Sequence, residues 1–247
     1  MKSDDARLRV AVVGAGRLGT ALTQALNHTE SIDVAGPFGR GFTGATYDVV
    51  LLCVPDREIP PAAAAVEPGP LVGHCSGATS PTVLDPHEGF VLHPLMTVRG
   101  DGGDELAGAA CTVAGTTPHA LTTARTLADA LGMPAVTVAD ADRGAYHAAA
   151  SFAANFAITV QACAARLLAG TGVPSEFLAP LARAALDNCA THGSRAALTG
   201  PVVRGDEETV AAQRQAVGDR APELLPLFDA LVEQTRRLTG RTEEVAA

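Results

Sequence analysis

Hydrophobic and polar positions follow two different patterns along the chain, with a change near residue 140. In the first half, short β-branched runs alternate with amphipathic stretches and Gly/Pro turns, which is typical of a parallel β-sheet flanked by helices. The predicted strands are 8–13, 32–35, 49–54, 71–75, 90–93, 110–114 and 135–138. The predicted helices of this half are 18–27, a short one at 60–66, and 119–131.

Strand patterns end after Asp140, and only helical patterns follow. The predicted helices there cover about 142–168, 175–192, 206–217 and 221–238. The change predicts two domains, an α/β domain over residues 1–139 and an all-α domain over residues 140–247. No long linker separates them, so tightly apposed domains are expected.

Composition and charge exclude several classes of protein. Hydrophobic residues make up 47% of the 247 residues, but aromatic residues only 4% and Trp is absent, so Ala, Val and Leu are expected to form the core. A net charge of −9 without a run of Lys or Arg opposes binding to nucleic acid or to an anionic membrane. The five cysteines are scattered and form no C-x-x-C spacing. This pattern predicts reduced thiols in a cytoplasmic protein, without a disulfide framework or metal site.

The stretch between Arg143 and Arg166 contains no formally charged residue over about the length of a membrane span. Much of it is alanine, and its polar members include His147, Ser151, Asn155 and Gln161. Because these residues make the stretch only weakly hydrophobic, a buried core helix is favoured over a membrane helix. The chain is therefore expected to be soluble and to have no transmembrane segment.

The segment Gly14-Ala15-Gly16-Arg17-Leu18-Gly19 follows the first predicted strand directly and opens the first predicted helix. This is the G-x-G-x-x-G pattern in the context that dinucleotide binding requires. Gly14 permits the tight turn, Gly16 lets a pyrophosphate approach the backbone, and Gly19 lets the helix pack against the sheet. Amide groups at the helix N-terminus can then bind phosphate. The first domain is therefore predicted to have a Rossmann-type fold.

The residue at the end of the second strand distinguishes NAD from NADP, because an acid there binds the ribose 2′-hydroxyl and a base binds a 2′-phosphate. Asp33 lies at the start of that strand, too early to reach the ribose, whereas Arg40 follows its end. Arg40 therefore favours NADP. The alternative is that Arg40 is a solvated loop charge, since the Gly36-Pro37-Phe38 turn makes its position hard to predict.

Six segments spread over nearly the whole chain resemble the DUF2520 family, in which a Rossmann-like domain precedes a helical domain. They are 14–19, Val54-Pro55-Asp56, His74-Cys75-Ser76-Gly77-Ala78, His93-Pro94-Leu95, Tyr146-His147-Ala148-Ala149-Ala150 with Asn155, and 199–206. The resemblance implies a member of the 6-phosphogluconate dehydrogenase-like superfamily, distantly related to pyrroline-5-carboxylate reductases, ketopantoate reductases and 3-hydroxyacid dehydrogenases. It also implies an NADP-linked reductase, and ketopantoate reduction has been suggested for some members of the group.

One departure from these relatives concerns the proton donor. 3-Hydroxyacid dehydrogenases open their long interdomain helix with a Lys followed four residues later by an Asn, but this chain has no Lys after Lys2. His147 occupies the corresponding position, which favours it as the proton donor. Ser151 lies four residues farther on the same helical face, and Asn155 another four. At 1.5 Å per residue, His147 and Asn155 are about 12 Å apart, so one small substrate cannot touch all three.

Two further histidines end predicted strands, at the edge where open α/β sheets bind their ligands. His74 is the alternative proton donor, and a structural role for it is an equal interpretation; for His93, the structural role is favoured. Ser76 follows His74 in a turn that can place backbone amides beside a nicotinamide. Val54 and Pro55 end another strand and are expected near the cofactor.

Arg204 follows a turn forced by Gly200 and Pro201, and its guanidinium suits a substrate carboxylate. An ion pair with Asp206 that stiffens the loop is the alternative. Together with what the resemblance implies, these residues predict an NADPH-dependent reductase of a small 2-oxo acid, with ketopantoate as the best single candidate. A cyclic-imine reductase and a non-enzymatic NADP-binding redox sensor are the alternatives. The apolar, alanine-rich helical domain predicts a homodimer.

Overall fold

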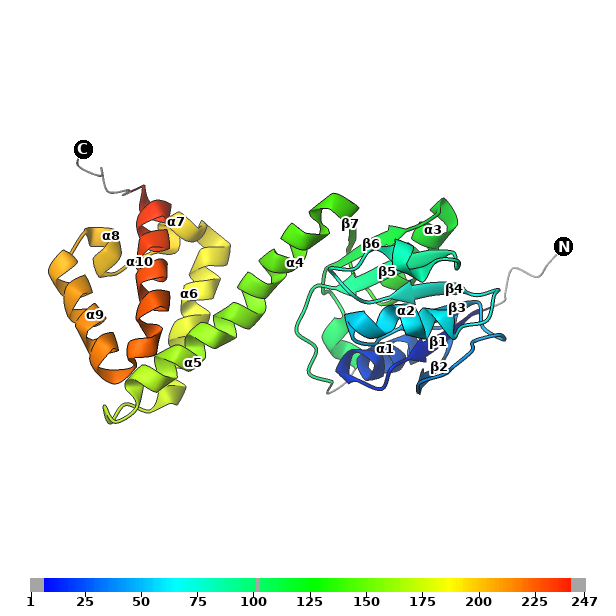
Figure 1. The fold of residues 1–247 in the computed structure, drawn as a ribbon, viewed down its shortest axis with the longest axis horizontal. Coiled ribbons are helices and arrows are strands. Elements are labelled where there is room, and N and C mark those ends of the chain that lie inside the picture. Colours follow the sequence, from blue (N-terminus) through cyan, green and yellow to red (C-terminus); the bar gives the residue numbers. More distant parts are fainter. Residues whose placement is uncertain (1–6, 101–102, 241–247) are drawn as a thin grey trace. The chain divides into compact units, whose positions relative to one another are not determined.

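A computed structural model describes residues 7–100 and 103–240 of the chain. Contacts divide the chain into two compact units, Met1–Ala154 and Asn155–Ala247 (Figure 1). Each unit is described by itself below. The division falls inside a long helix, whereas the composition of the sequence changes near residue 140, so the two criteria give different boundaries.

The first unit is built on a seven-stranded sheet with the order β2-β1-β3-β4-β5-β6-β7. The strands are β1 Leu8–Val13, β2 Ile32–Phe38, β3 Val49–Leu52, β4 Leu71–His74, β5 Gly89–Pro94, β6 Cys111–Gly115 and β7 Ala135–Thr137. All neighbours pair in parallel except β5 and β6. The predicted α/β fold, a Rossmann-type domain followed by helices, is confirmed, and all seven predicted strands are present.

The antiparallel direction of β6 departs from the predicted parallel sheet. A parallel connection needs a crossover segment, usually a helix, that returns the chain to the same edge. Between β5 and β6, the described residues contain only a short 3-10 turn, η3 (Gly103–Leu106). The chain therefore turns at the end of β5, and β6 runs in the opposite direction. The hydrophobic pattern of a strand does not indicate its direction.

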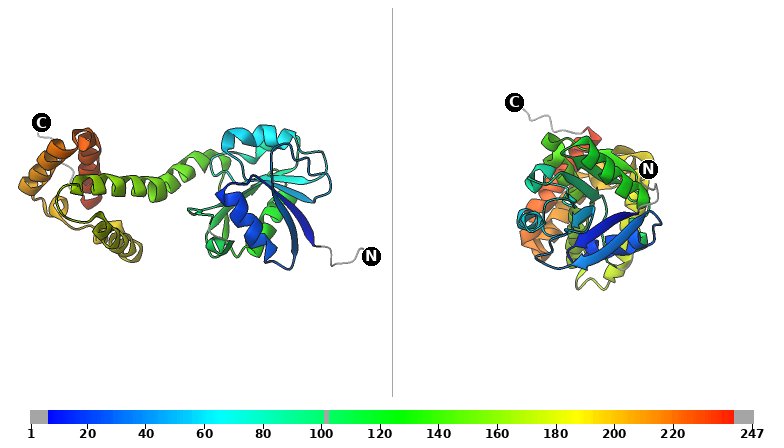
Figure 2. Two further views of the ribbon diagram at one scale, coloured as in Figure 1. Left: turned by 90° about the horizontal axis from the view of Figure 1, so that it is seen from below. Right: turned by 90° about the vertical axis from the view of Figure 1, so that its right-hand side faces the viewer.

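Successive residues of the central strands enter two separate cores, one on each face of the sheet. The helices of this unit are α1 Arg17–Asn27, α2 Ile59–Ala64, α3 Pro118–Ala130 and α4 Arg143–Ser151. In β1, Val10 and Val12 belong to the core formed with α1 and α3, whereas Ala11 and Val13 belong to the core formed with α2. This alternation follows from the two-residue period of a strand. Figure 2 shows α1 and α2 on opposite faces of the sheet.

Helices make up the second unit, as predicted. They are α5 Ala157–Leu168, α6 Leu178–His192, α7 Ser194–Ala197, α8 Pro201–Arg204, α9 Glu207–Arg220 and α10 Leu225–Thr239, with 3-10 turns η6 Ser175–Phe177 and η7 Pro222–Leu224. Asp206 caps α9, because its Oδ1 atom accepts a hydrogen bond from the Thr209 amide at 3.1 Å. An ion pair of Arg214 with Asp229, at 2.8 Å, joins α9 to α10.

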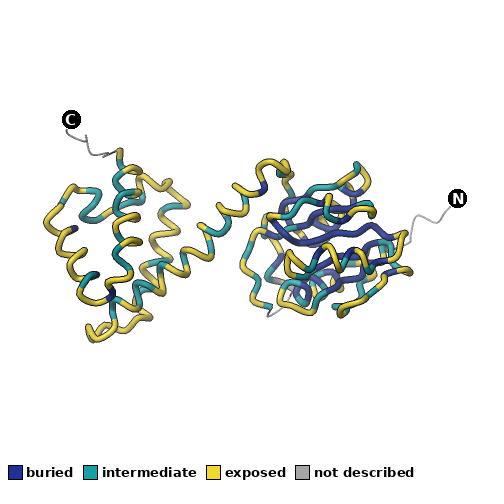
Figure 3. The backbone as a smooth tube through the Cα atoms, in the orientation of Figure 1, coloured by how far each residue is buried: buried dark blue, intermediate teal, exposed yellow. Residues whose placement is uncertain are grey.

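The long helix predicted at 142–168 is present, with a change of geometry in its middle. A π-helical turn, η5 (Phe152–Phe156), joins α4 to α5. By length and composition alone, the helix Asp140–Leu168 could cross a membrane, a test that core helices of soluble proteins also pass. None of its most apolar stretch is buried (Figure 3). The expectation of a buried core helix is therefore wrong for the described residues, because the alanines that indicated a core lie on exposed or half-exposed surface.

Candidate active site

The glycine-rich turn after β1 has the geometry that close approach of a nucleotide requires. Gly14 has a φ of +110°, and a Cβ atom there would lie 2.3 Å from the carbonyl oxygen of Cys53. A Cβ on Gly19 would lie 1.9 Å from the carbonyl oxygen of Gly14, so α1 packs this closely only with glycine. Nothing lies within 4 Å of a Cβ built on Gly16. This position is open to a ligand, and no side chain caps the N-terminus of α1.

A cavity of about 420 Å³ adjoins this turn. Its lining includes Ala15 of the turn and Val54 and Pro55 of the loop after β3. Phe38 and Phe42 stack with ring centroids 4.1 Å apart and supply an aromatic wall. The cavity therefore combines an apolar side, which suits an adenine ring, with the glycine-rich turn that leads into α1.

Arg40 lies in the lining of this cavity together with an acid that sequence reasoning missed. Its side chain is 91% exposed, and its Nη2 atom lies 3.5 Å from Oε2 of Glu58, which lines the same cavity. Glu58 follows β3 and approaches Arg40 only in three dimensions. A base in this position favours the 2′-phosphate of NADP, and an acid favours the free 2′-hydroxyl of NAD. Arg40 and Glu58 therefore favour different cofactors, although they line the same cavity. Of the other turn residues, Arg17 is exposed and Leu18 packs against the core.

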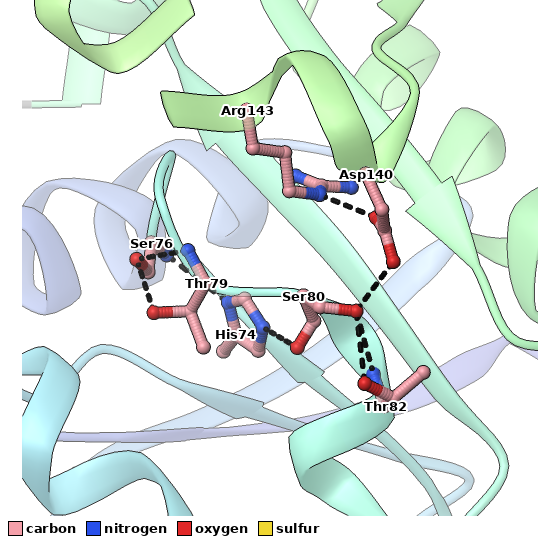
Figure 4. Close-up of polar contacts among 7 residues, drawn as sticks. All are labelled: His74, Ser76, Thr79, Ser80, Thr82, Asp140 and Arg143. Atoms are coloured by element: carbon pink, nitrogen blue, oxygen red, sulfur yellow. Dashed lines mark hydrogen bonds and ion pairs between the residues drawn. The ribbon is translucent and has the colours of Figure 1, made fainter. Parts of the chain in front are cut away.

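His74 ends β4 and is fully buried. Its Nδ1 atom accepts a hydrogen bond from the amide of Ser76 at 3.2 Å, and its Nε2 atom lies 3.4 Å from the carbonyl oxygen of Ser80 (Figure 4). An acceptor at Nδ1 leaves the proton on Nε2, so backbone groups engage both ring nitrogens of the neutral form. Burial lowers the pKa of His74 to about 4. In this geometry His74 fixes the turn after β4, in which Ser76 is also buried.

Ser80 connects this turn to the start of α4 through a buried arginine. The Ser80 hydroxyl donates a hydrogen bond to Oδ2 of Asp140 at 2.6 Å, and Oδ1 of Asp140 accepts one from Nε of Arg143 at 2.7 Å (Figure 4). Arg143 is 2% exposed, and its Nη1 and Nη2 atoms are buried without a hydrogen-bond partner among the described residues. Neither charged residue of this connection was predicted as a site residue, although Arg143 marks the start of the uncharged stretch.

His93, on β5, is the centre of an aromatic cluster with two residues of α4. Its Nδ1 atom lies 2.7 Å from the hydroxyl oxygen of Tyr146, and the two rings are nearly perpendicular at 88°. The ring centroid of His147 lies 6.3 Å from that of His93. Burial lowers the pKa of His93 to about 4 and raises the pKa of Tyr146. Tyr146 was also missed as a site residue, although it precedes His147 in the same sequence motif.

The remaining predicted site residues lie on or beside helices. Ser151 is half-buried at the last position of α4. Asn155, in η5, is exposed and belongs to the second unit, where its carbonyl accepts a hydrogen bond from the Thr159 hydroxyl at 3.0 Å. Arg204 is exposed at the end of α8 in the same unit. It forms no ion pair with Asp206 within the described residues, and the Asp206 side chain instead caps α9.

The family model described as a domain of unknown function (DUF2520) matches residues 109–235, just over half of the chain. The chain belongs to the DUF2520 family. The family resemblance of the sequence is thereby confirmed, and the matched region includes Tyr146, His147 and Arg204. Comparison with curated proteins finds no match to this DUF2520 protein.

Solved structures share the fold of this DUF2520 protein over nearly its whole length. A protein from Thermotoga maritima has a TM-score of 0.81 at 21% identity, covering 94% of this chain and 99% of its own. A Bacteroides fragilis protein provisionally named an NADP oxidoreductase has a TM-score of 0.79 at 18% identity, covering 94% and 98%. Pyrroline carboxylate reductase from Plasmodium falciparum, with NADP bound, has a TM-score of 0.56 at 11% identity, covering 94% and 98%. At these identities the likeness shows the fold.

Stability should fall as the pH drops from about 6.5 toward 4, because burial lowers the pKa of His74 and His93 to about 4. Each imidazole binds a proton more readily in the unfolded chain, so its contribution is full above pH 6.5 and is lost below it. At pH 5 each of the two histidines should lower the free energy of unfolding by about 2 kcal/mol relative to pH 7.5. Urea unfolding at both pH values measures the loss. His74→Asn should remove about half of it and the exposed control His28→Asn none; an equal loss in wild type and His74→Asn would contradict the prediction.

Proposed function

We propose that the protein is an NADPH-dependent reductase of a small 2-oxo acid, with ketopantoate as the leading candidate substrate. One observation carries the proposal: the glycine-rich turn and the cluster of His93, Tyr146 and His147 lie along one edge of a single sheet. β1, β3, β4 and β5 are successive parallel neighbours, so their carboxyl ends share that edge. Ligands of open α/β sheets bind there.

The residues along this edge fit an extended dinucleotide. The uncapped N-terminus of α1 and the open position at Gly16 suit a pyrophosphate. Val54 and Pro55 lie after β3, and Ser76 lies after β4, between the glycine-rich turn and His93 along this edge. Arg40 supplies a cation for a 2′-phosphate. When bound, the cofactor supplies the hydride, while the chain supplies binding, orientation and a proton.

His147 is the proposed source of that proton. It is exposed and makes no hydrogen bond to the described residues, so both ring nitrogens are available. His74, the alternative donor, has both ring nitrogens engaged by backbone groups and would have to break one of these contacts to act. The environment of each ring therefore favours His147.

The substrate carboxylate is assigned to Arg204. Its guanidinium is exposed and forms no ion pair among the described residues, which leaves it available for bidentate contact. Ser151, one turn farther along the long helix, is proposed to orient the substrate. Asn155, about 12 Å from His147, is proposed to support packing.

Reduction of a cyclic imine is the second candidate function, because pyrroline carboxylate reductase from Plasmodium falciparum shares the fold. A panel of 2-oxo acids and cyclic imines, assayed by NADPH oxidation, distinguishes the two. Tight NADPH binding without turnover of any member would contradict both and would favour a redox sensor.

Cofactor preference should depend on the balance between Arg40 and Glu58. Arg40→Ala should weaken NADPH binding about tenfold and leave NADH binding nearly unchanged, because only NADPH carries the 2′-phosphate. Glu58→Gln should tighten NADPH binding, because it removes a negative charge 3.5 Å from the Arg40 side chain. Titration of cofactor fluorescence measures both, with the exposed Arg125→Ala as control. Unchanged NADPH affinity in Arg40→Ala, or wild-type NADH binding as tight as NADPH binding, would contradict this assignment.

His147→Ala should lower kcat at least about 100-fold, the lower end of what a positioned general acid contributes. NADPH affinity and Tm should stay nearly unchanged, because the side chain is exposed and carries no hydrogen bond. His74→Ala should instead lower Tm while turnover per folded molecule is retained. Steady-state kinetics and thermal unfolding of both variants separate these outcomes. A folded His147→Ala protein with close to the wild-type rate would show that another group donates the proton.

A homodimer formed through the helical unit is also proposed. Among residues 155–240 the buried side chains are Val210, Val217 and Ala221 (Figure 3). Large apolar side chains are exposed in and around α6 and α10: Phe177, Leu181, Leu186, Leu227, Leu231 and Leu238. Exposed apolar surface of this extent marks an interface, and a second copy can cover it through the same residues in a two-fold arrangement.

Light scattering at micromolar concentration should give twice the chain mass of 25.1 kDa. Leu181→Glu, at an exposed apolar position of α6, should shift the protein toward monomer because it places a charge in the proposed interface. Arg183→Glu, at an exposed polar position of the same helix, should remain dimeric. A wild-type monomer with full activity would rule out the proposed assembly.

A further inference from the structure

His93 and Tyr146, which are 53 positions apart in the sequence, form a hydrogen-bonded pair. His93 is the next-to-last residue of β5, and Tyr146 belongs to α4. We propose that the Tyr146 hydroxyl, oriented by His93, donates a hydrogen bond to the substrate carbonyl oxygen and stabilises the alkoxide that hydride addition creates. This inference rests on the proposed function, in which His147 supplies the proton.

In its neutral form the pair can present one donor to a substrate. Burial lowers the pKa of His93 to about 4 and raises the pKa of Tyr146, so at neutral pH the imidazole is uncharged and the phenol is protonated. A neutral imidazole has a single N–H group. The tautomer with this proton on Nδ1 donates to the Tyr146 oxygen 2.7 Å away. The phenol O–H can then point to the neighbouring Thr112 hydroxyl, which also acts on Tyr146, or turn to a substrate oxygen.

The imidazole of His93 has little freedom to turn away from Tyr146. A Cβ atom on Gly77 would lie 2.8 Å from Cε1 of His93, so the ring lies directly against the backbone of the turn after β4. The ring of Tyr146 meets it edge-on, with centroids 5.6 Å apart. A donor that is fixed before the substrate binds needs no reorganisation as negative charge develops, which is the condition for electrostatic stabilisation.

The buried guanidinium of Arg143 also favours a negative oxygen near the pair. Beyond the effect of burial, the guanidinium of Arg143 lowers the pKa of both His93 and Tyr146. Cys111 acts on Tyr146 in the opposite direction, and Asp56 does so on His93. Because Arg143 is buried, its field is screened less than that of a surface cation.

The position of the pair along the sheet agrees with this role. His93 lies near the end of β5, three strands from β1 in the sheet order, which is about 14 Å at the usual strand spacing. The glycine-rich turn follows β1. The pair therefore lies beyond the proposed pyrophosphate site, on the same edge, where the reacting end of an extended dinucleotide is expected.

Tyr146→Phe tests the inference, because it removes the hydroxyl and keeps the ring. It should lower kcat about 100- to 1,000-fold, as loss of one donor to a developing oxyanion does, while NADPH affinity and Tm stay close to wild type. The chain has two tyrosines, so Tyr47→Phe is a matched control. Tyr47 packs against Phe38 and Phe42 without a side-chain hydrogen bond in the described residues, and its variant should keep the wild-type kcat. A kcat within about threefold of wild type in Tyr146→Phe would overturn the proposal.

His93→Gln tests the positioning role separately. Its kcat should fall nearly as far as that of Tyr146→Phe. The double variant should be no slower than Tyr146→Phe alone, because both changes remove one shared contact with the substrate. A merely structural role for His93 predicts losses that add. Additive losses would therefore overturn the orientation of Tyr146 by His93.

Failure of the proposed function can be told apart from failure of this inference. If the wild type reduces no member of the substrate panel, oxamate, an unreactive analogue of a 2-oxo acid, is titrated into the protein–NADPH complex and followed by NADPH fluorescence. Binding about tenfold weaker in Tyr146→Phe, with wild-type binding in Tyr47→Phe, supports the contact even without turnover. Equal oxamate binding in Tyr146→Phe and wild type, or none to the wild type, overturns it.

Discussion

The buried guanidinium of Arg143 fixes the start of the long helix against the sheet, and the candidate active site depends on this contact. It binds Asp140, Asp140 binds Ser80, and the Ser80 carbonyl lies against His74. The Arg143 side chain is buried and that of Asp140 is half exposed, so loss of Asp140 would leave a buried guanidinium without its partner. Such a contact therefore specifies position more than it adds net stability. It places α4 so that residues 146 and 147, three and four positions along, meet the end of β5.

His74 and His93, near the ends of neighbouring strands, show how the environment gives one type of side chain two different roles. His74 is the last residue of β4 and His93 the next-to-last of β5, and burial lowers the pKa of both to about 4. Backbone groups engage both nitrogens of His74, whereas His93 shares one nitrogen with the hydroxyl of Tyr146. The first ring therefore holds a turn, and the second orients a group that can reach a ligand. Residue type is the same and both lie near the carboxyl ends of neighbouring strands, so the contacts of each ring distinguish their roles.

The elements of the fold and the nucleotide turn follow from local sequence, whereas the contacts of the site do not. Strand periodicity and the glycine spacing each act within a few residues, which is why all seven strands and the Gly14 turn could be predicted. The pairs that define the site join residues far apart, 53 positions between His93 and Tyr146 and 60 between Ser80 and Asp140. They form only because particular strands end side by side, and strand order is a property of the whole sheet. Glu58 beside Arg40 escaped prediction for the same reason.

The two units differ in how their sequences achieve stability. In the sheet, aliphatic side chains from both faces of each central strand are fully buried, and each such side chain contributes about 1.5–3 kcal/mol. The helical unit has few such residues and relies on caps and exposed ion pairs, which individually contribute about 1 kcal/mol or less. Alanine favours helix formation but buries little area, so these helices can form without a large core of their own. If a second copy supplies the missing burial, the stability of the helical unit must rise with protein concentration, while that of the sheet does not.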